Sequence, residues 1–203
     1  MATLADTAAD VYADPAAERL GTPANVITLV RTVAAVATAG VAAQQESLTL
    51  LVVALAVYWV GDILDGAVAR LRGCETRIGA TLDILSDRLC AASFYLGLVW
   101  LMPDLTWPVM VYLAEFMVVD CFVSLAFLAW PIRSPNYFFV VDRRLWLWNW
   151  SKTGKAVNSS IFAVLLLVTE SVVLGLVVAL ALLLLKCVSL VRLMRLGLPV
   201  PKR

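Results

Sequence analysis

The stretch GDILDGAVARLRGCETRIGATLDILSD, residues 61–87, decides how this 203-residue chain is interpreted. It places four aspartates and three arginines together in a sequence that is 62% hydrophobic and only 15% charged. Because soluble proteins carry about 25% charged residues, the composition indicates a membrane protein, and the length suits one compact domain. So many charges in one short stretch of an apolar chain need a chemical reason.

The overall charge and residue content exclude several classes of function. A formal net charge of +1 lacks the basic footprint of a nucleic-acid-binding protein. The absence of histidine excludes His-based catalytic triads and His metal sites. The cysteines are scattered without a CxxC pair, so we expect neither a zinc site nor a disulfide framework, but small apolar side chains. These four residues are Cys74, Cys90, Cys121 and Cys187.

Residues 1–22 are expected to precede the membrane domain as a short, partly disordered leader. Their sequence, MATLADTAADVYADPAAERLGT, is acidic and alanine-rich. A signal peptide would begin with basic residues followed by an apolar run, so none is expected here. Residues 14–22 allow a brief surface helix, with Pro15 in its first turn.

Six apolar stretches are long enough to cross a bilayer, for which a helix needs about 20 residues. They predict an all-α integral membrane domain of six transmembrane helices over residues 23–196, followed by a basic tail at 197–203. The stretches run near 23–43, 48–72, 77–102, 107–131, 153–170 and 172–195.

Lysine and arginine are unevenly distributed between the links. The links at 44–47, 103–106 and 169–171 carry none, whereas the other links and the end of the chain carry most of them. Because cytoplasmic links carry an excess of Lys and Arg, we expect both termini and both basic links to be cytoplasmic. Six spans give the even number that this arrangement requires.

The aspartates of the opening stretch form two pairs. Asp62 and Asp65 are three residues apart near the cytoplasmic end of the second span, and Asp83 and Asp87 are four apart near the start of the third. Each pair shares one face of an α-helix. The short link makes the two spans antiparallel neighbours, so the active site is expected between them, on the cytoplasmic side.

Four converging carboxylates would repel one another, because like charges disfavour ionisation. One or two divalent cations would relieve this repulsion, and hard oxygen ligands suit Mg²⁺, Mn²⁺ or Ca²⁺ rather than zinc or copper. Such a centre favours a phosphate-bearing substrate. Gly66 and Gly79 leave room either for that ligand or for helix packing. Arg70 either reaches the phosphate or extends to the membrane surface.

Two further acids, Glu115 and Asp120, lie inside the fourth apolar stretch. An ionisable residue in a membrane span is a functional candidate by default. A spacing of five puts them on different faces of an α-helix, so they are not expected to form one site. Each is either functional or the partner of a basic residue on a neighbouring helix.

The aspartate-rich stretch resembles the signature DxxDGxxARx8GxxxDxxxD of the CDP-alcohol phosphotransferases at every fixed position. The first span opens with TPANVITLVRT, similar to the TPNxLTLxR pattern common in that family. The matching signature residues are Asp62, Asp65, Gly66, Ala69, Arg70, Gly79, Asp83 and Asp87.

The resemblance implies a phospholipid-synthesising enzyme that moves a phosphatidyl group from CDP-diacylglycerol to an alcohol, releasing CMP. It implies that Asp62, Asp65 and Asp83 ligate Mg²⁺ or Mn²⁺, two ions in all. Asp87 lies at the same metal centre and acts as the catalytic base. A homodimer in a bacterial cell membrane is also implied. The residues expected to bind the CDP donor are Gly66, Ala69, Arg70, Gly79 and, more weakly, Thr28.

The acceptor is less constrained by the sequence. Residues 149–161, NWSKTGKAVNSSI, resemble the start of the fifth span in phosphatidylglycerophosphate and cardiolipin synthases. Glycerol 3-phosphate is therefore the first expectation, phosphatidylglycerol the second and inositol phosphate the third. Basic residues either bind the acceptor phosphate or set the topology. These are Lys152, Lys155, Arg133, Arg143 and Arg144.

One alternative from a different class is a divalent-cation transporter, because transporters also place acids inside membranes. A transporter needs a path through both faces. The four aspartates lie towards one side, and the outer span ends offer few acids beyond Glu46, Asp104 and Glu170. The sequence therefore favours the enzyme.

Overall fold

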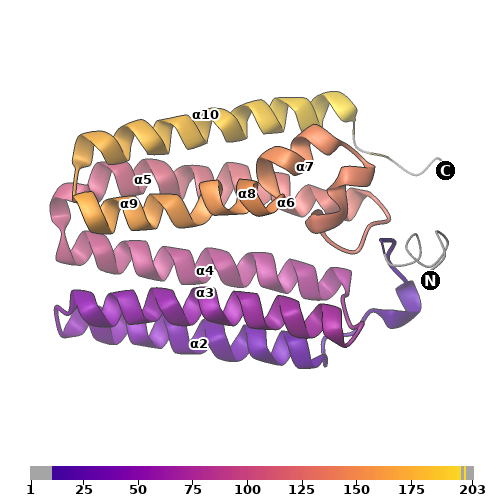
Figure 1. Ribbon diagram of the computed structural model, residues 1–203, viewed down its shortest axis with the longest axis horizontal. Helices are drawn as coiled ribbons and strands as arrows, with labels where there is room; N and C mark the ends of the chain where they lie inside the picture. The colour runs from indigo at the N-terminus through magenta and orange to yellow at the C-terminus, as the bar shows by residue number, and fades with distance from the viewer. Residues whose placement is uncertain (1–10, 198, 200–203) are drawn as a thin grey trace.

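The computed structural model describes residues 11–197 and 199, and these form a bundle of long helices lying side by side (Figure 1). Two of the rods are interrupted by π-helical turns. The long helices are α2 (Pro23–Gln44), α3 (Leu48–Leu71), α4 (Arg77–Leu101) and α10 (Val172–Leu196). One interrupted rod consists of α5 (Thr106–Ala114), η3 (Glu115–Asp120) and α6 (Cys121–Leu125). The other consists of α8 (Lys152–Lys155), η6 (Ala156–Ser160) and α9 (Ile161–Thr169). The short helices are η1 (Pro15–Ala17), η2 (Pro103–Leu105), η4 (Ala126–Ala129), η5 (Pro135–Val140) and α7 (Arg143–Asn149).

Five helical segments are long and apolar enough to cross a membrane, one fewer than the sequence predicts. They are 23–44, 48–71, 77–101, 103–129 and 172–196. The sixth expected span corresponds to the rod of α8, η6 and α9, which runs beside the others in the bundle (Figure 1). Its first turns, KTGK and AVNSS, are polar, so this rod differs from the five apolar helices in composition.

The helices begin where hydroxyl side chains cap them. The Oγ atoms of Thr22, Ser47, Thr76 and Ser171 each accept a hydrogen bond from the backbone N–H three residues later. Such a cap satisfies an N–H group that has no partner within the helix. These four residues therefore set the start of α2, α3, α4 and α10.

The link between α3 and α4 fixes how the two aspartate-bearing helices face each other. Gly73 has a φ of +57°, in the left-handed region that favours glycine after a helix. The N–H of Cys74 then bonds to the carbonyl of Ala69 at 3.0 Å and closes the end of α3. Thr76 starts α4 three residues after Gly73, so the chain reverses within a few residues.

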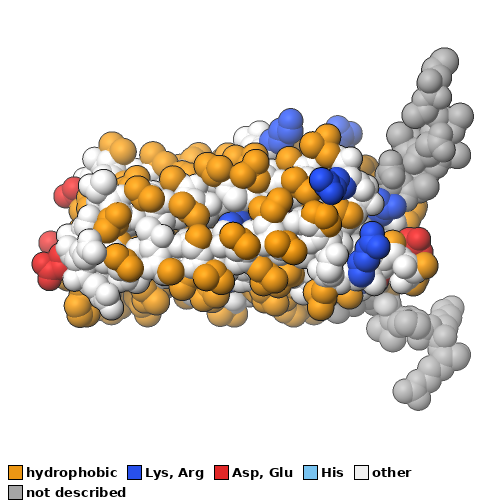
Figure 2. Space-filling view, turned by 90° about the horizontal axis from the view of Figure 1, so that it is seen from below, with side chains coloured by type: hydrophobic (Ala, Val, Ile, Leu, Met, Phe, Trp, Pro, Cys, Tyr) orange, Lys and Arg blue, Asp and Glu red, His pale blue; other side chains and the backbone are white. Residues whose placement is uncertain are grey.

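The bundle is apolar outside as well as inside. Orange side chains cover most of the face in Figure 2, and Val33, Leu96 and Val168 are more than 60% exposed. Inside, stacked rings join α5 to α9, with the ring centroids of Tyr112 and Phe162 4.3 Å apart. An apolar exterior of this extent fits contact with lipid rather than water.

Both described ends of the chain lie at the same end of the bundle (Figure 1). Lysine and arginine side chains gather towards that end, and acidic side chains occupy the opposite one (Figure 2). The links predicted to be basic therefore share one end of the molecule. The cytoplasmic orientation of that end remains a prediction from charge bias.

The segment before α2 is tied to the bundle. A 3-10 turn at Pro15–Ala17, capped by Asp14, occupies part of the expected surface helix. The Glu18 carboxylate accepts the backbone N–H groups of Arg77 and Ile78, at 2.8 and 3.0 Å, where α4 begins. Residues 1–10 of the expected leader and residues 198 and 200–203 of the expected basic tail lie outside the described residues.

Candidate active site

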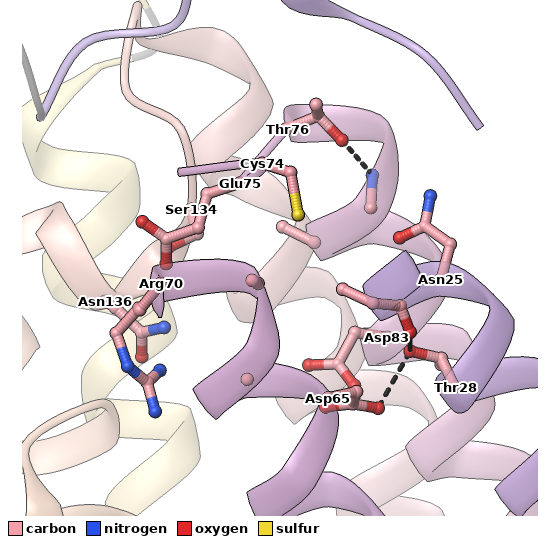
Figure 3. A pocket seen from close by; sticks show the side chains of 15 residues that line it. Asn25, Thr28, Asp65, Arg70, Cys74, Glu75, Thr76, Asp83, Ser134 and Asn136 are labelled. Atoms are coloured by element: carbon pink, nitrogen blue, oxygen red, sulfur yellow. Dashed lines mark hydrogen bonds between the residues drawn. The ribbon is translucent and has the colours of Figure 1, made fainter. Parts of the chain in front are cut away.

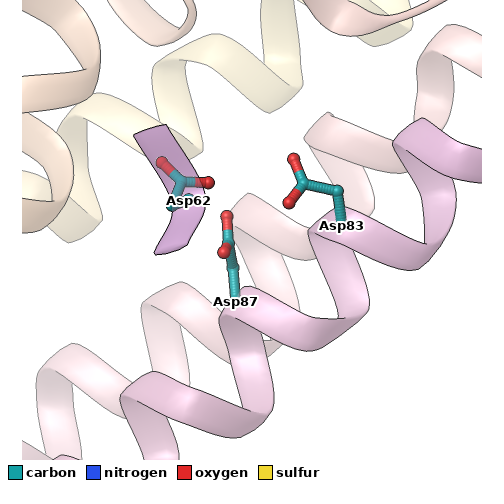
Figure 4. A group of neighbouring side chains, drawn as sticks. All are labelled: Asp62, Asp83 and Asp87. Carbon is teal, nitrogen blue, oxygen red and sulfur yellow. The ribbon is translucent and has the colours of Figure 1, made fainter. Parts of the chain in front are cut away.

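Three half-buried carboxylates meet between α3 and α4 (Figure 4). Asp62 comes from α3, and Asp83 and Asp87 come from successive turns of α4. Each offers an oxygen that lies within 4.8 Å of the oxygens offered by the other two. A set made only of carboxylate oxygens fits Mg²⁺ or Mn²⁺.

Asp65 lies beside this group but is bound differently. It is buried, and its Oδ2 accepts hydrogen bonds from Thr28 Oγ1 at 2.7 Å and Arg31 Nε at 2.8 Å (Figure 3). The structure therefore brings together Asp62, Asp83 and Asp87, with Asp65 held against α2. A direct role for Asp65 as a metal ligand stays a prediction.

Arg31 on α2 is a site residue that the sequence reasoning did not single out. Its Nη2 lies 2.6 Å from Asp83 Oδ1, 2.9 Å from Asp87 Oδ1 and 3.6 Å from Asp62 Oδ1. A signal was present in TPANVITLVRT, because an arginine within an apolar span needs an acidic partner. Its partners could not be chosen from the sequence, since they lie 31 to 56 residues further along.

A cavity opens beside Asp65 and Asp83 (Figure 3). All five residues expected to bind the donor line it: Thr28, Gly66, Ala69, Arg70 and Gly79. In Figure 3, Arg70 and Asn136 lie on one side of the cavity, and Asn25 and Thr28 lie on the other.

Gly79 permits a close approach of two helices at this cavity. A Cβ atom at position 79 would lie 2.8 Å from Asn25 Oδ1 and 2.9 Å from Thr76 Oγ1, closer than real Cβ contacts. At Gly66, by contrast, a Cβ would meet the far end of the Arg70 side chain, at 3.2 Å. Glycine therefore leaves room for the Asn25 and Thr76 side chains at position 79 and for the Arg70 guanidinium at position 66.

A second, larger cavity borders the same group of carboxylates. Asp62, Asp83 and Asp87 all line it, and it shares Asp83 with the first cavity. Many of its other lining side chains are neutral and carry a hydroxyl or an amide. These are Ser124, Ser134, Asn136, Asn149, Asn158 and Ser160.

The five basic residues expected to bind the acceptor do not gather at one place. Among the described residues, Lys155 is the member of that set that lines the second cavity. Lys152, Arg143 and Arg144 are exposed on α8 and α7. Arg133 donates from Nε to the carbonyl of Tyr12 at 2.8 Å and so holds the N-terminal segment.

The family model described as CDP-alcohol phosphatidyltransferase matches residues 21–192. This range includes every aspartate that lines either cavity. The chain belongs to the CDP-alcohol phosphatidyltransferase family. Its match extends beyond the signature and covers α2 to α10 almost completely.

Relatives of this chain carry more specific descriptions. Phosphatidylinositol phosphate synthase of Mycolicibacterium smegmatis is 39% identical over 85 residues, 42% of this chain and 38% of that protein. The protein of the same name from Mycobacterium tuberculosis is 37% identical over 82 residues, 40% of this chain and 38% of its own length. Archaetidylinositol phosphate synthase of Methanothermobacter thermautotrophicus is 41% identical over 88 residues, 43% of this chain and 44% of its own.

The matched part of the chain thus spans only about two fifths of the length of these relatives. No solved structure matches the chain significantly. The expected likeness to phosphatidylglycerophosphate and cardiolipin synthases is not supported, because the relatives found are named for inositol phosphate.

Part of the wall of the second cavity is a buried ion network. Asp120 binds Arg88 of α4 through Oδ2 and Lys186 of α10 through Oδ1. Lys186 Nζ also donates to Asn149 Oδ1 at 2.8 Å. Asp120 thus has basic partners on two neighbouring helices, which is one of the two roles that the sequence left open.

The expectation that Glu115 and Asp120 face different ways assumed an α-helix and needs correction. Residues 115–120 are π-helical, and in a π-helix each backbone N–H bonds to the carbonyl five residues earlier. Two residues five apart therefore lie close to one face. Both side chains are buried, with Glu115 1% and Asp120 7% exposed.

Proposed function

We propose that this phosphatidyltransferase moves a phosphatidyl group from CDP-diacylglycerol to an inositol phosphate and releases CMP. The observation that carries the choice of acceptor is the second cavity. Its hydroxyl and amide side chains lie beside Asp87 and suit a ligand with many hydroxyl groups. The names of the relatives support the same acceptor, so inositol phosphate replaces glycerol 3-phosphate as the first choice.

The donor is proposed to bind in the first cavity. Its diphosphate would lie near Arg70, where Gly66 leaves space for the guanidinium. Asp62, Asp83 and Asp87 would hold Mg²⁺ or Mn²⁺, with Asp65 beside them. We propose two ions at this site. The metal would neutralise the diphosphate and stabilise charge on the leaving CMP.

Asp87 is proposed to be the base because it lines the second cavity beside the carboxylates of the first. It would take the proton of the acceptor hydroxyl, whose oxygen forms a bond to the β-phosphorus of CDP-diacylglycerol. The bond from that phosphorus to the oxygen of CMP breaks. A carboxylate within hydrogen-bond reach of a hydroxyl typically contributes about 10²- to 10⁴-fold to the rate.

Lys155 is proposed to bind the phosphate of the acceptor. It lines the second cavity together with Asp62, Asp83 and Asp87, so it lies near the proposed reacting groups. The cations Arg88 and Lys186 form part of the wall of the same cavity and bind Asp120. A phosphorylated polyol would thus find a cation at the mouth and polar neutral groups further in.

The placement in the membrane completes the proposal. We take α8, η6 and α9 as the sixth span, with both termini and the site on the cytoplasmic side. The lipid tails of the donor would stay in the bilayer while its nucleotide enters from the water. A homodimer is carried over from the family resemblance as a further proposal.

An acceptor screen tests this function. The purified full chain in detergent with Mg²⁺ receives CDP-diacylglycerol and, in turn, inositol phosphate, inositol, glycerol 3-phosphate, phosphatidylglycerol or serine. We expect CMP release with inositol phosphate above all others. Release with glycerol 3-phosphate alone would overturn the acceptor, and no release with any of them would overturn the reaction.

A further inference from the structure

A cation of the protein itself lies among the four aspartates. The Arg31 side chain is 3% exposed, and it contacts Asp65 through Nε and Asp83 and Asp87 through Nη2. Its third nitrogen, Nη1, is buried without a hydrogen-bond partner in the described part of the chain. A guanidinium so fully enclosed by carboxylates is a strong electrostatic partner.

The surroundings of Arg31 are shaped to hold it. A Cβ atom at position 61 would lie 2.5 Å from Arg31 Cβ and 2.6 Å from Arg31 Cδ, so Gly61 makes room for this side chain. The guanidinium carbon lies 5.5 Å from the centre of the Tyr58 ring. Thr28, one turn earlier on α2, shares Asp65 Oδ2 with Arg31 Nε.

The two ends of the guanidinium have different partners. Nε binds Asp65, which stands outside the three-carboxylate group, and Nη2 binds Asp83 and Asp87, which belong to it. Asp65 therefore anchors the arginine to α3, and the other end bridges two turns of α4. Asp83 and Asp87 would have to give up Nη2 to hold a metal ion, whereas the bond from Nε to Asp65 lies outside the three-carboxylate group.

We propose that Arg31 is a resident counter-cation: it positions the carboxylates before metal binds, and the metal displaces it from Asp83 and Asp87. This inference rests on the proposed metal role of the cluster. Four aspartates surround this one arginine, so the cluster holds more acids than resident cations and can attract divalent ions. Arg31 is a positioning residue, since it acts through the aspartates.

The proposal predicts a dependence on metal that ordinary helix packing would not give. Without Arg31, the carboxylates repel one another until metal arrives, so Arg31→Gln should lower the melting temperature strongly in EDTA. Saturating Mn²⁺ should restore much of the loss. The increase in melting temperature on adding Mn²⁺ should therefore be larger in Arg31→Gln than in the wild type.

Direct titration of Mn²⁺ followed by electron paramagnetic resonance gives a second readout that does not use activity. Removing the competing cation should lower the Kd for Mn²⁺ by about tenfold, the change expected from about 1.4 kcal/mol. An unchanged or higher Kd for Arg31→Gln, with the same loss of melting temperature in EDTA and in Mn²⁺, would show that Arg31 does not compete with the metal.

Two variants keep the test sharp. Arg88→Gln removes an equally buried arginine that binds Asp120 instead, so its melting temperature should fall by the same amount in EDTA and in Mn²⁺. Arg31→Lys keeps the charge but cannot bridge two sites, so its Mn²⁺ increment should exceed that of the wild type, a test that stands even if Arg31→Gln fails to fold. Absence of Mn²⁺ binding in the wild type would overturn the metal site itself, whereas Mn²⁺ binding without CMP release would contradict only the proposed function.

Discussion

Lys186 of α10 and Arg88 of α4 bind opposite oxygens of one buried carboxylate, that of Asp120. This bond pair ties the helix that carries Asp83 and Asp87 to the last helix of the bundle. It also forms part of the wall of the second cavity. The network therefore stabilises the bundle and defines the cavity in which we place the acceptor.

Replacing Asp120 by asparagine should be strongly destabilising. The change would leave Arg88 and Lys186 buried without their counter-charge, and breaking a buried ion pair typically costs about 3–5 kcal/mol. Thermal unfolding in detergent measures the effect. The matched control is Asp104→Asn, an exposed aspartate at the opposite end of the bundle, which should leave the melting temperature nearly unchanged. Equal melting temperatures for the two variants would show that the network contributes little.

Asp87→Asn should lower kcat by about 10²- to 10⁴-fold, because the amide cannot take a proton from the acceptor hydroxyl. The asparagine keeps the shape of the side chain, so the KM for CDP-diacylglycerol should change much less than kcat. Steady-state CMP release measures both constants. Asp62→Asn is the comparison: as a proposed ligand without a proton-transfer role, it should shift the Mg²⁺ concentration needed for half-maximal rate. Full activity of Asp87→Asn would exclude Asp87 as the base.

The main features of the site follow from short-range sequence patterns. Spacings of three and four put Asp62 with Asp65 and Asp83 with Asp87 on helix faces, and the short link turns those faces towards each other. Such relations depend on the period of an α-helix and on a link of a few residues. The residues expected to bind the donor came from the family resemblance; they line the first cavity, and their role there stays a prediction.

Other features depend on contacts that the sequence pattern does not contain. The ion pairs of Arg31 cross from α2 to both α3 and α4, so several aspartates were equally plausible partners. The π-helix at Glu115–Asp120 changes the number of residues per turn, so helix faces assigned from the α-helical period do not apply to this segment. Lys152 and Lys155 lie three residues apart on α8, yet of these two Lys155 is the one that lines the second cavity.

Asp142 should make a contribution to stability that depends on pH. Its carboxylate caps α7 and binds Arg192, with Nη2 at 2.7 Å. Burial opposes ionisation, but the hydrogen bonds from Arg192 and the Leu145 N–H outweigh it and hold the pKa of Asp142 below its usual value. A lowered pKa in the folded state gives stability that is present above the unfolded value of about 3.9 and is lost as the pH falls through the folded value.

Asp142→Asn keeps a residue suited to capping but removes the charge, so it isolates this contribution. The variant should melt below the wild type at pH 7, and the difference should shrink as the pH falls below about 4. Melting temperatures measured at several pH values test the trend. In the background of Arg192→Gln, the same substitution should have a smaller effect. A difference that stays constant with pH would contradict the role of the charge.

Lys155 and Lys152 give a matched pair for the acceptor site, since they lie three residues apart on α8 and only Lys155 is among the described residues that line the second cavity. Lys155→Gln should raise the KM for inositol phosphate by about tenfold, the loss expected for one phosphate contact of about 1.4 kcal/mol. Lys152→Gln should leave it unchanged. The KM for CDP-diacylglycerol, measured in the same CMP-release experiment, separates acceptor binding from damage to the whole site. A lysine that only sets topology acts through the orientation of the chain in the membrane. Equal effects of the two substitutions on the KM would therefore mean that both lysines have only that role. Other cations of the cavity would then have to bind the acceptor phosphate.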